Sequence, residues 1–390
     1  MHTNTTKKKI AILSLLRGGI GHYIAQISPY LSEDYDLTYI SYKFGLPGDE
    51  VTLDDPAIKN NITSEPFFII RYNDYKEINQ SLGETVGVLK KENINVLNVH
   101  VGTIARETVY FLIPLVLAAK ELGIKILYTF HDVEPFEKYL PGQEVLKEFY
   151  NLADGGTVGN LQEQKLLIDK YEFPKEKLIL AEHGIYTIFD FNKYDKESAR
   201  KHLGISMDKK VILNFGILRP YKGFDDTIKA MPELLKKDSN YFLHISAGVR
   251  VFGGPEDLIK LNKELHLEND SKMDFDYVPS DEIEPIFKSA DVVVLPYKQV
   301  SQSGILNLAL YFKKPVIISN LFMEKDEINN KLGLVVEPGD PNKIADAIHE
   351  ILGDAELYKK YQENISQYIK NDRWQEATNN YKKIIEDILR

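Results

Sequence analysis

The amino-acid sequence repeats one local pattern, in which a short apolar run is followed by a loop and then by a helical repeat of apolar positions. In its clearest copy, the run 291–296 precedes a small-residue loop and the segment 305–312, which is apolar nearly all round. These features predict a strand buried on both faces and a buried helix. Ser301 or Ser303 is the candidate N-cap of that helix. Free N–H groups and the helix dipole at such an N-terminus favour phosphate, although an ordinary turn is the alternative for this copy alone.

A second copy lies near the N-terminus, where residues 9–15 predict a strand and residues 23–31 have apolar side chains at helical spacing. Between them, Gly18, Gly19 and Gly21 permit a tight turn and the close approach of a ligand to the backbone. The third glycine of the dinucleotide-binding fingerprint is missing. A plain turn is therefore the alternative interpretation of this loop.

A third copy predicts a strand at 211–216 and a helix at 224–235, with two cations, Arg219 and Lys222, in the loop between them. A guanidinium forms planar bidentate contacts and an ammonium is a compact charge, so the pair suits a diphosphate. The alternative is a solvated turn in which the two cations bind nothing.

Strand and helix signals alternate along the whole chain, which indicates parallel sheets covered by helices on both faces. At 390 residues the chain exceeds what one core usually supports, and the pattern restarts after a polar stretch at 186–206. We therefore expect an α/β protein with two doubly wound, Rossmann-like domains at 1–188 and 189–372. The other predicted strands include 35–41, 96–99, 125–130, 242–246, 275–278 and 316–318, and the other predicted helices include 74–91, 103–122 and 281–289.

Three histidines, His100, His131 and His183, follow or flank predicted strands of the first domain. Ligands of parallel sheets bind at the carboxyl ends of the strands. A lone histidine there is usually a structural residue, but three on one edge favour a functional role. They do not resemble metal ligands, because only the pair His131–Asp132 has a partner at chelating spacing.

Composition excludes several classes of protein. The net charge of −10 argues against nucleic acid as the main partner, and the absence of cysteine excludes disulfides and thiolate chemistry. Residues 1–9 are polar and predict no secretory leader, and the longest apolar stretch, 109–119, is too short to span a bilayer. We expect a cytoplasmic protein, with residues 7–9 and 109–119 as candidate contacts to a membrane surface.

The motifs of this chain, taken in their order along the sequence, resemble those of the retaining glycosyltransferases of family 4, which have the GT-B fold. The resemblance covers nearly the whole chain. The motifs that carry it are residues 17–21, 129–133, 182–185, 215–223, 277–279 and 289–297. The stretch 215–223, Phe-Gly-Ile-Leu-Arg-Pro-Tyr-Lys-Gly, is the most specific match. The resemblance implies two domains that face each other across a cleft, with a final helix, 373–390, that crosses back to cover the first domain.

The resemblance also implies a role for each motif. The first domain would hold the acceptor and the second a nucleoside diphosphate sugar, with UDP or GDP as the nucleotide. Arg219 and Lys222 would hold the pyrophosphate and His131 would lie by the donor sugar, which makes these three the candidate catalytic residues. The candidate donor-binding residues are Gly18, Gly19, Gly21, Gly216, Val278, Ser301, Gln302, Ser303, Gly304 and Ile305. His100 and Glu134 are candidate acceptor-side groups, although an exposed loop acid is the alternative for Glu134.

One departure from the family pattern concerns two glutamates that the family commonly carries with seven residues between them. Val300 and Leu308 occupy those positions here, and a Gln-Ser-Gly loop at 302–304 remains. Each lost charge-assisted hydrogen bond is worth about 1.5–3 kcal/mol. The departure weakens predictions about ribose recognition and sugar identity more than the prediction of donor binding.

The predicted function is transfer of a sugar from a nucleoside diphosphate sugar to a hydroxyl of a glycan or lipid-linked acceptor, with retention and without a metal ion or other cofactor. Many relatives build surface polysaccharides or glycolipids. One alternative is a catalytically silent GT-B subunit that binds a partner protein or glycan, which Val300 and Leu308 motivate. Another is a different enzyme of the same fold, such as a sugar-nucleotide epimerase or a phosphorylase.

Overall fold

The computed structural model describes residues 7–14, 18–43, 55–60, 62, 67–71, 75–102, 106–134, 142–248, 254–300, 303–371 and 373–390. The chain forms two compact units, each of which is described here by itself. Unit 1 comprises Met1–Gly184 together with Arg373–Arg390, and unit 2 comprises Ile185–Asp372. The sequence analysis placed the corresponding boundary after residue 188.

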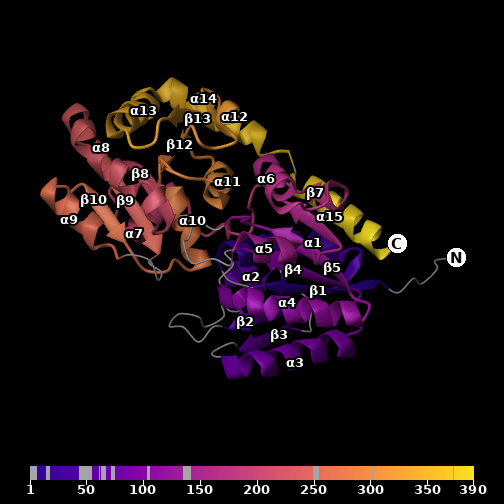
Figure 1. The fold of residues 1–390 in the computed structure, drawn as a ribbon. Helices are drawn as coiled ribbons and strands as arrows, with labels where there is room; N and C mark the ends of the chain where they lie inside the picture. Colours follow the sequence, from indigo (N-terminus) through magenta and orange to yellow (C-terminus); the bar gives the residue numbers. More distant parts are fainter. Residues whose placement is uncertain are drawn as a thin grey trace. The chain divides into compact units, whose positions relative to one another are not determined.

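The sheet of unit 1 has seven parallel strands in the order β3-β2-β1-β4-β5-β6-β7 (Figure 1). The strands are β1 (Lys8–Ser14), β2 (Tyr35–Lys43), β3 (Phe67–Arg71), β4 (Val96–Val101), β5 (Lys125–Phe130), β6 (Gly155–Val158) and β7 (Leu178–Leu180). The strand order reverses between β1 and β4. In doubly wound sheets, ligands bind at the carboxyl ends of the strands beside such a reversal, the switch point.

Helices cover both faces of this sheet. They are α1 (Gly18–Ser32), α2 (Pro56–Lys59), α3 (Tyr75–Lys91), α4 (Arg106–Glu121), α5 (Gln143–Tyr150), α6 (Leu161–Tyr171) and α15 (Arg373–Leu389), and a short 3-10 turn, η1 (Lys175–Lys177), precedes β7. Side chains alternate along a strand, so Tyr128 and Phe130 of β5 join the core under α4, α5 and α6, whereas Thr129 faces the side of α15. Gly155 lies so near α15 that an added Cβ would be 2.9 Å from Ile384.

The sheet of unit 2 has six parallel strands in the order β10-β9-β8-β11-β12-β13 (Figure 1). The strands are β8 (Lys210–Ile217), β9 (Tyr241–Gly248), β10 (Ser271–Asp274), β11 (Val292–Leu295), β12 (Val316–Ser319) and β13 (Gly333–Val336). The order reverses between β8 and β11, which is the switch point of this unit. Strands β11 and β12 are buried along their whole length, as expected of central parallel strands.

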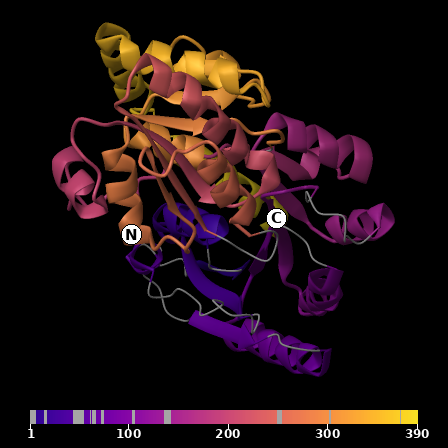
Figure 2. The same cartoon turned by 90° about the vertical axis from the view of Figure 1, so that its left-hand side faces the viewer.

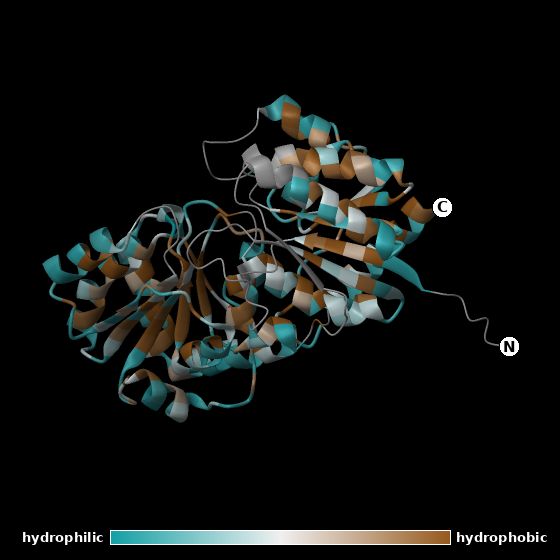
Figure 3. Cartoon of the chain, turned by 90° about the horizontal axis from the view of Figure 1, so that it is seen from below, coloured by the Kyte–Doolittle hydropathy of each residue, from teal (hydrophilic) through white to brown (hydrophobic). Residues whose placement is uncertain are grey.

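The strands of unit 2 lie between layers of helices (Figure 2). These helices are α7 (Lys196–Leu203), α8 (Phe224–Lys237), α9 (Glu256–Glu264), α10 (Ser280–Ser289), α11 (Gly304–Tyr311), α12 (Lys325–Ile328), α13 (Pro341–Gly353) and α14 (Ala355–Tyr368), with a 3-10 turn, η2 (Pro220–Lys222), before α8. Helices α8 and α13 pack their apolar sides on one face of the sheet, and Phe287 of α10 packs on Phe215 on the other. Figure 3 shows the apolar strands of unit 2 at its centre and polar residues on its outer helices.

The structure confirms the predicted architecture of two doubly wound parallel sheets, although one strand was placed wrongly and strand β3 was not predicted. Residues 275–278, which are Phe-Asp-Tyr-Val, were predicted as a strand, but they form a loop, and the strand is β10 at Ser271–Asp274. This edge strand pairs only with β9 and its side chains are half-buried, so it lacks the apolar pattern of a central strand. Residues 103–105 of the predicted helix 103–122 lie outside the described residues.

The apolar stretch 109–119 lies in α4. Its residues Leu112, Leu115 and Val116 are buried in the core of unit 1, whereas Leu117 is exposed. Most of the apolar surface that motivated a membrane contact is therefore used by the fold. Within the described part of the chain, no helix combines the length and the apolar character that crossing a bilayer requires.

Candidate functional site

The carboxyl end of β8, at the switch point of unit 2, brings Gly216, Lys222 and Ile305 into contact. A Cβ added to Gly216 would lie 2.5 Å from Lys222 Nζ and 2.5 Å from Ile305 Cδ1. The φ angle of Gly216 is +131°, a conformation that L side chains rarely adopt. Strand β8, turn η2 and helix α11 thus meet at a backbone position that only glycine fits.

A second glycine explains why the loop after β8 folds back onto the end of β11. Gly223 has φ +67°, and an added Cβ would lie 2.5 Å from the carbonyl oxygen of Pro296. The N–H of Lys298 donates a 2.6 Å hydrogen bond to the carbonyl of Tyr221. These two contacts hold turn η2 against the end of β11 and so fix the position of Lys222.

The ammonium of Lys222 is buried and lies 5.4 Å from the centroid of the Tyr297 ring. Burial, together with the nearby cation Arg219, lowers the pKa of Lys222 to about 7. No carboxylate of the described residues lies within ion-pair distance of this ammonium. A buried cation whose strongest charged neighbour is another cation is suited to an anionic ligand.

Helix α11 begins beside this site. Ser303 is its N-cap, because the hydroxyl of Ser303 accepts a 3.3 Å hydrogen bond from the N–H of Leu306, and Gly304 and Ile305 form its first turn. Of the two predicted caps, the structure therefore identifies Ser303, while Ser301 and Gln302 lie outside the described residues. The first turn carries no acidic residue, so its N–H groups and dipole favour an anion.

Val278 lies one strand further along the same edge of the sheet. Gly248, at the end of β9, pairs with Ile217 and packs against the backbone of Tyr277, whose Cα would be 3.6 Å from a Cβ on Gly248. Val278 follows Tyr277 in the loop before α10 and is half-buried. The structure thus brings the described members of the predicted donor set in unit 2 to one edge, although Val278 is not in contact with Lys222.

In unit 1, the three predicted histidines form a cluster around Tyr23. Nδ1 of His100 lies 2.9 Å from Nε2 of His131, and the ring centroid of Tyr23 lies 4.9 Å from that of His131 and 4.6 Å from that of His183. Burial lowers the pKa of His100 to about 3 and that of His183 to about 4, and it holds the pKa of His131 well below its ordinary value. All three imidazoles are therefore neutral near pH 7.

The N-terminal glycines differ from their predicted arrangement. Helix α1 begins at Gly18, so Gly18, Gly19 and Gly21 form its first turn instead of a loop before it. This turn contacts the end of β4, because a Cβ on Gly102 would lie 2.5 Å from Ile20 Cδ1. The glycines therefore lie at the switch point of unit 1, and among the described residues a Cβ on Gly19 would have no neighbour within 4 Å.

Glu134 has partners within unit 1. Its Oε1 accepts a hydrogen bond from the ammonium of Lys170 and one of 3.0 Å from the hydroxyl of Tyr171. Both donors belong to α6, so the carboxylate ties the segment after β5 to that helix. These contacts favour the alternative that Glu134 is a structural acid.

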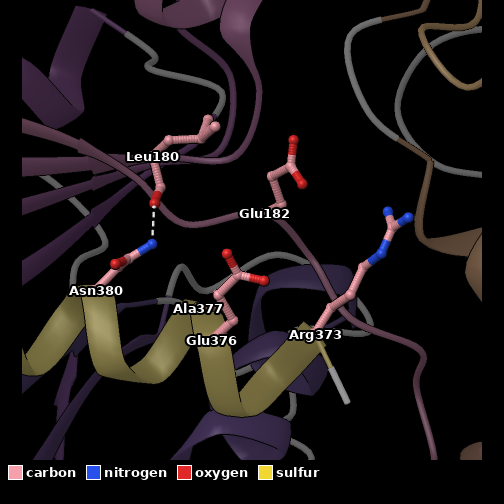
Figure 4. A pocket seen from close by; sticks show the side chains of 6 residues that line it. All are labelled: Leu180, Glu182, Arg373, Glu376, Ala377 and Asn380. Carbon is pink, nitrogen blue, oxygen red and sulfur yellow. Dashed lines mark hydrogen bonds between the residues drawn. The ribbon is translucent and has the colours of Figure 1, made fainter. Parts of the chain in front are cut away.

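A pocket beside α15 has none of the candidate site residues in its lining. It is lined by Leu180, Glu182, Arg373, Glu376, Ala377 and Asn380, and the amide of Asn380 donates a 2.8 Å hydrogen bond to the carbonyl of Leu180 (Figure 4). Glu182 belongs to a motif of the predicted resemblance, yet none of the candidate catalytic residues lines this pocket. Among the described residues, no group of three or more His, Asp or Glu side chains is arranged to hold a metal ion.

Sequence reasoning missed several residues that surround the histidines. The side chains of Asn98, Thr129 and Tyr381 are hydrogen-bonded in the same cluster, and the ring of Trp374 stacks on His183 with centroids 5.8 Å apart. Asn98 and Thr129 interrupt apolar runs in β4 and β5, a signal that could have been noticed. The two aromatic residues come from α15, whose return to unit 1 no local pattern indicates.

Comparisons with known proteins agree with this architecture. Residues 195–368 match the family described as glycosyl transferases group 1. A D-inositol 3-phosphate glycosyltransferase of Corynebacterium efficiens is 25% identical over 233 residues, which are 57% of this chain and 54% of that protein. The protein YtcC of Bacillus subtilis is 25% identical over 382 residues, 93% of this chain and 86% of its own. The chain spans about half the length of the D-inositol 3-phosphate glycosyltransferases that it matches.

The fold is similar to that of Anabaena Alr3699/HepE, whose structure was solved in complex with UDP-glucose. The TM-score is 0.73 at 17% identity, and the superposition covers 97% of this chain and 99% of that one. Identity this low establishes the fold alone. The chain has the GT-B fold, and its residues 195–368 match the family described as glycosyl transferases group 1.

Proposed function

We propose that this chain is a glycosyltransferase that moves a sugar from a nucleoside diphosphate sugar to a hydroxyl group of a glycan or lipid-linked acceptor. The observation that carries the proposal is the buried Lys222 ammonium beside Arg219, at the switch point of a group 1 domain. Burying like charges together costs free energy in the free protein, and a diphosphate would offset that cost. UDP is the proposed nucleotide, since the similar HepE structure holds UDP-glucose, with GDP as the second choice.

The chemistry follows from the charge that develops on the leaving group. When the bond between the anomeric carbon and the diphosphate oxygen breaks, negative charge grows on the diphosphate. Arg219, Lys222 and the N-terminus of α11 would stabilise that charge, which is the task a metal ion performs elsewhere. The acceptor oxygen attacks the anomeric carbon from the face that the diphosphate leaves, and its proton passes to the departing oxygen. The configuration is retained without a carboxylate nucleophile.

Further residues complete the proposed site. The donor-binding set is Gly18, Gly19, Gly21, Gly216, Val278, Ser301, Gln302, Ser303, Gly304 and Ile305. His131 is the proposed contact to the donor sugar, and unit 1 is the proposed acceptor side, with His100 among its residues. We place the reaction in the cytoplasm, in the synthesis of a polysaccharide or glycolipid.

A catalytically silent subunit that binds a partner protein or glycan is the second candidate function. Leu308 favours it, because this residue is a buried apolar side chain of α11 where the resembled family commonly carries an acid. The buried Lys222 argues against it, since a surface that binds only a protein gains nothing from a cation pair that is costly to bury.

Calorimetric titration of UDP, GDP, ADP and their sugars, without added metal, tests the proposal. Wild type should bind one nucleotide selectively, whereas Lys222→Ala and Arg219→Ala should bind it at least tenfold more weakly. Lys236→Ala is the matched control, because Lys236 is an exposed lysine of the same unit that pairs only with Glu233 of its own helix. If no nucleotide binds at millimolar concentration, the transferase proposal fails and the silent subunit takes its place. The anomeric configuration of the product, read by NMR, then tests retention.

A further inference from the structure

A continuous chain of hydrogen bonds runs through unit 1 from helix α15 to His131. The hydroxyls of Tyr381 and Thr129 are hydrogen-bonded to each other, and Thr129 Oγ1 donates a 2.9 Å bond to Asn98 Oδ1. Asn98 Nδ2 lies 3.3 Å from His100 Nε2, and His100 Nδ1 lies 2.9 Å from His131 Nε2. All five side chains are buried, so water does not compete for these bonds.

The strand pattern explains how this chain is assembled. Val99 and Val101 of β4 point into the core under α4, so their neighbours Asn98 and His100 point to the opposite face. Thr129 of β5 points to that same face, because it pairs with His100 in register across the two strands. Helix α15 covers this face and contributes Tyr381. Polar residues at alternate positions of β4 and β5 thus form one network, and the last helix extends it with Tyr381.

The chain has a direction, which follows from what each group can donate. An amide nitrogen donates and does not accept, so His100 Nε2 must accept from Asn98. A neutral imidazole carries one N–H, so the proton of His100 lies on Nδ1 and is donated to His131 Nε2. His131 Nε2 is then an acceptor, which leaves the proton of His131 on Nδ1.

Two observations support this assignment. Burial keeps both imidazoles neutral, because it lowers the pKa of His100 to about 3 and that of His131 well below its ordinary value, where His100 and His183 act in the same direction. Thr157 Oγ1 donates to Thr129 Oγ1 at 3.3 Å, so the Thr129 oxygen already receives a hydrogen and directs its own to Asn98 Oδ1. That contact fixes the orientation of the Asn98 amide.

We propose that Tyr381 and His100 are positioning residues that hold His131 in the tautomer protonated at Nδ1, so that His131 offers a hydrogen-bond donor to an oxygen of its ligand. Within the described residues, Nδ1 of His131 has no hydrogen-bond partner, so this N–H is left for a ligand. The identity of that ligand as a sugar hydroxyl rests on the proposed function, whereas the tautomer does not. The last helix thereby determines the hydrogen-bonding character of a residue that lies far from it in the sequence.

The tautomer is measured directly by long-range ¹H–¹⁵N NMR of the full chain labelled with [¹⁵N]histidine, in which a protonated and an unprotonated ring nitrogen have well-separated shifts. The His131 signals are assigned by their loss in His131→Gln. In wild type we expect the proton on Nδ1. In Tyr381→Phe and in His100→Leu we expect the form of His131 protonated at Nε2 to appear. His100→Asn keeps a hydrogen-bond donor near the position of His100 Nδ1, so it should show the wild-type pattern.

Tyr128→Phe is the matched control, because it removes a buried tyrosine hydroxyl of the same unit that has no hydrogen-bond partner in the described part of the chain. Its His131 spectrum should equal that of wild type. If the transferase assay succeeds, kcat should fall about 10- to 100-fold in Tyr381→Phe with nucleotide affinity unchanged. Losses of this size are usual for residues that orient a ligand-binding side chain through hydrogen bonds. A wild-type proton on Nε2, or a tautomer that ignores both substitutions, overturns the proposal. Because the NMR measurement needs no substrate, its outcome is separate from the fate of the proposed function.

Discussion

Gly216 and Lys222 are packed so closely that the smallest possible side chain at position 216 would collide with the ammonium at position 222. An added Cβ would be 2.5 Å from Nζ. Gly216→Ala should therefore displace Lys222 and weaken binding of the nucleoside diphosphate at least tenfold, as measured by calorimetry.

Gly204→Ala is the control for this substitution. Gly204 also has a positive φ angle, +70°, but no heavy atom lies within 4 Å of an added Cβ. Backbone strain costs about 1–3 kcal/mol in each variant. Gly204→Ala shows the effect of strain away from the site, whereas Gly216→Ala adds the collisions with Lys222 and Ile305. Equal affinities in the two variants would mean that Gly216 is needed only for its backbone conformation and not for the position of Lys222.

The lowered pKa of Lys222 predicts that nucleotide binding takes up a proton. The free ammonium has a pKa of about 7, and a bound diphosphate raises it towards or above the ordinary value of 10.5. At pH 8.5 the free group is mostly neutral and the bound group is charged. The affinity should therefore fall as pH rises above 7, by up to tenfold per pH unit, and should gain nothing from this group below pH 7.

Calorimetry at pH 8.5, in buffers of different ionisation enthalpy, measures this uptake. The nucleotide phosphates are fully ionised at that pH and do not contribute. Lys222→Arg is the control, because a guanidinium stays protonated throughout this range and takes up no proton on binding. Proton uptake that persists unchanged in Lys222→Arg would assign the titration to another group.

The local sequence was sufficient to predict those helices and strands whose residue pattern depends only on nearby positions in the chain. The alternating strands and helices and the Ser303 cap are of this kind, because burial of a central strand and capping of a helix leave local signals. The glycines at 18–21 misled the prediction, because glycine favours loops locally while the structure places these residues in the first turn of α1. The edge strand β10 was missed because half-buried strands carry no apolar run.

Contacts between distant segments could not be predicted. The carboxylate of Glu134 binds Lys170 and Tyr171 of α6, and the local sequence gives no sign of these contacts. The same holds for Tyr381, whose contact with Thr129 depends on where the last helix packs. The sequence therefore indicated which edge of each sheet carries the candidate site. It did not indicate which side chains interact at that edge.

Glu134→Gln tests the structural interpretation of this acid. The glutamine oxygen still accepts from Tyr171, and the ion pair with Lys170 is partly exposed, so the free energy of unfolding should fall by only about 0–1 kcal/mol. Activity should stay within twofold of wild type in a sugar-transfer assay. A large fall in kcat at unchanged stability would instead make Glu134 an acceptor-side catalytic group.

Gly19→Ala separates a ligand contact from a folding requirement. Because no heavy atom of the residues that the structure describes lies within 4 Å of an added Cβ, we expect the helix to accept alanine, and the melting temperature should stay equal or rise. If a donor approaches this backbone closely, kcat/KM should nevertheless fall about tenfold. Gly87→Ala, in α3 and equally free of neighbours, should leave kcat/KM unchanged. Equal activity in both variants would remove Gly19 from the proposed donor site.

Arg200 and Asp291 form a buried ion pair that explains one motif of the family resemblance without a ligand. Asp291 Oδ2 accepts a 2.8 Å bond from Arg200 Nη2 and a 2.7 Å bond from the N–H of Val211, and the Arg200 side chain is 1% exposed. Arg200 also donates to the carbonyls of Ser289 and Lys209. The acid of the 289–297 motif therefore anchors helix α7 to the sheet of unit 2.

Arg200→Met should lower the free energy of unfolding of unit 2 by about 3–5 kcal/mol, because it removes the buried charged partner of Asp291 Oδ2. Lys196→Met is the matched control: Lys196 pairs with the other oxygen of Asp291 at 2.5 Å but is half-exposed, so its loss should cost only about 0–1 kcal/mol. Urea titration followed by circular dichroism measures both. Under native conditions each variant should bind the nucleotide as wild type does, since neither residue contacts the cation pair. Weakened binding by Arg200→Met at unchanged stability would instead make Asp291 part of the ligand site.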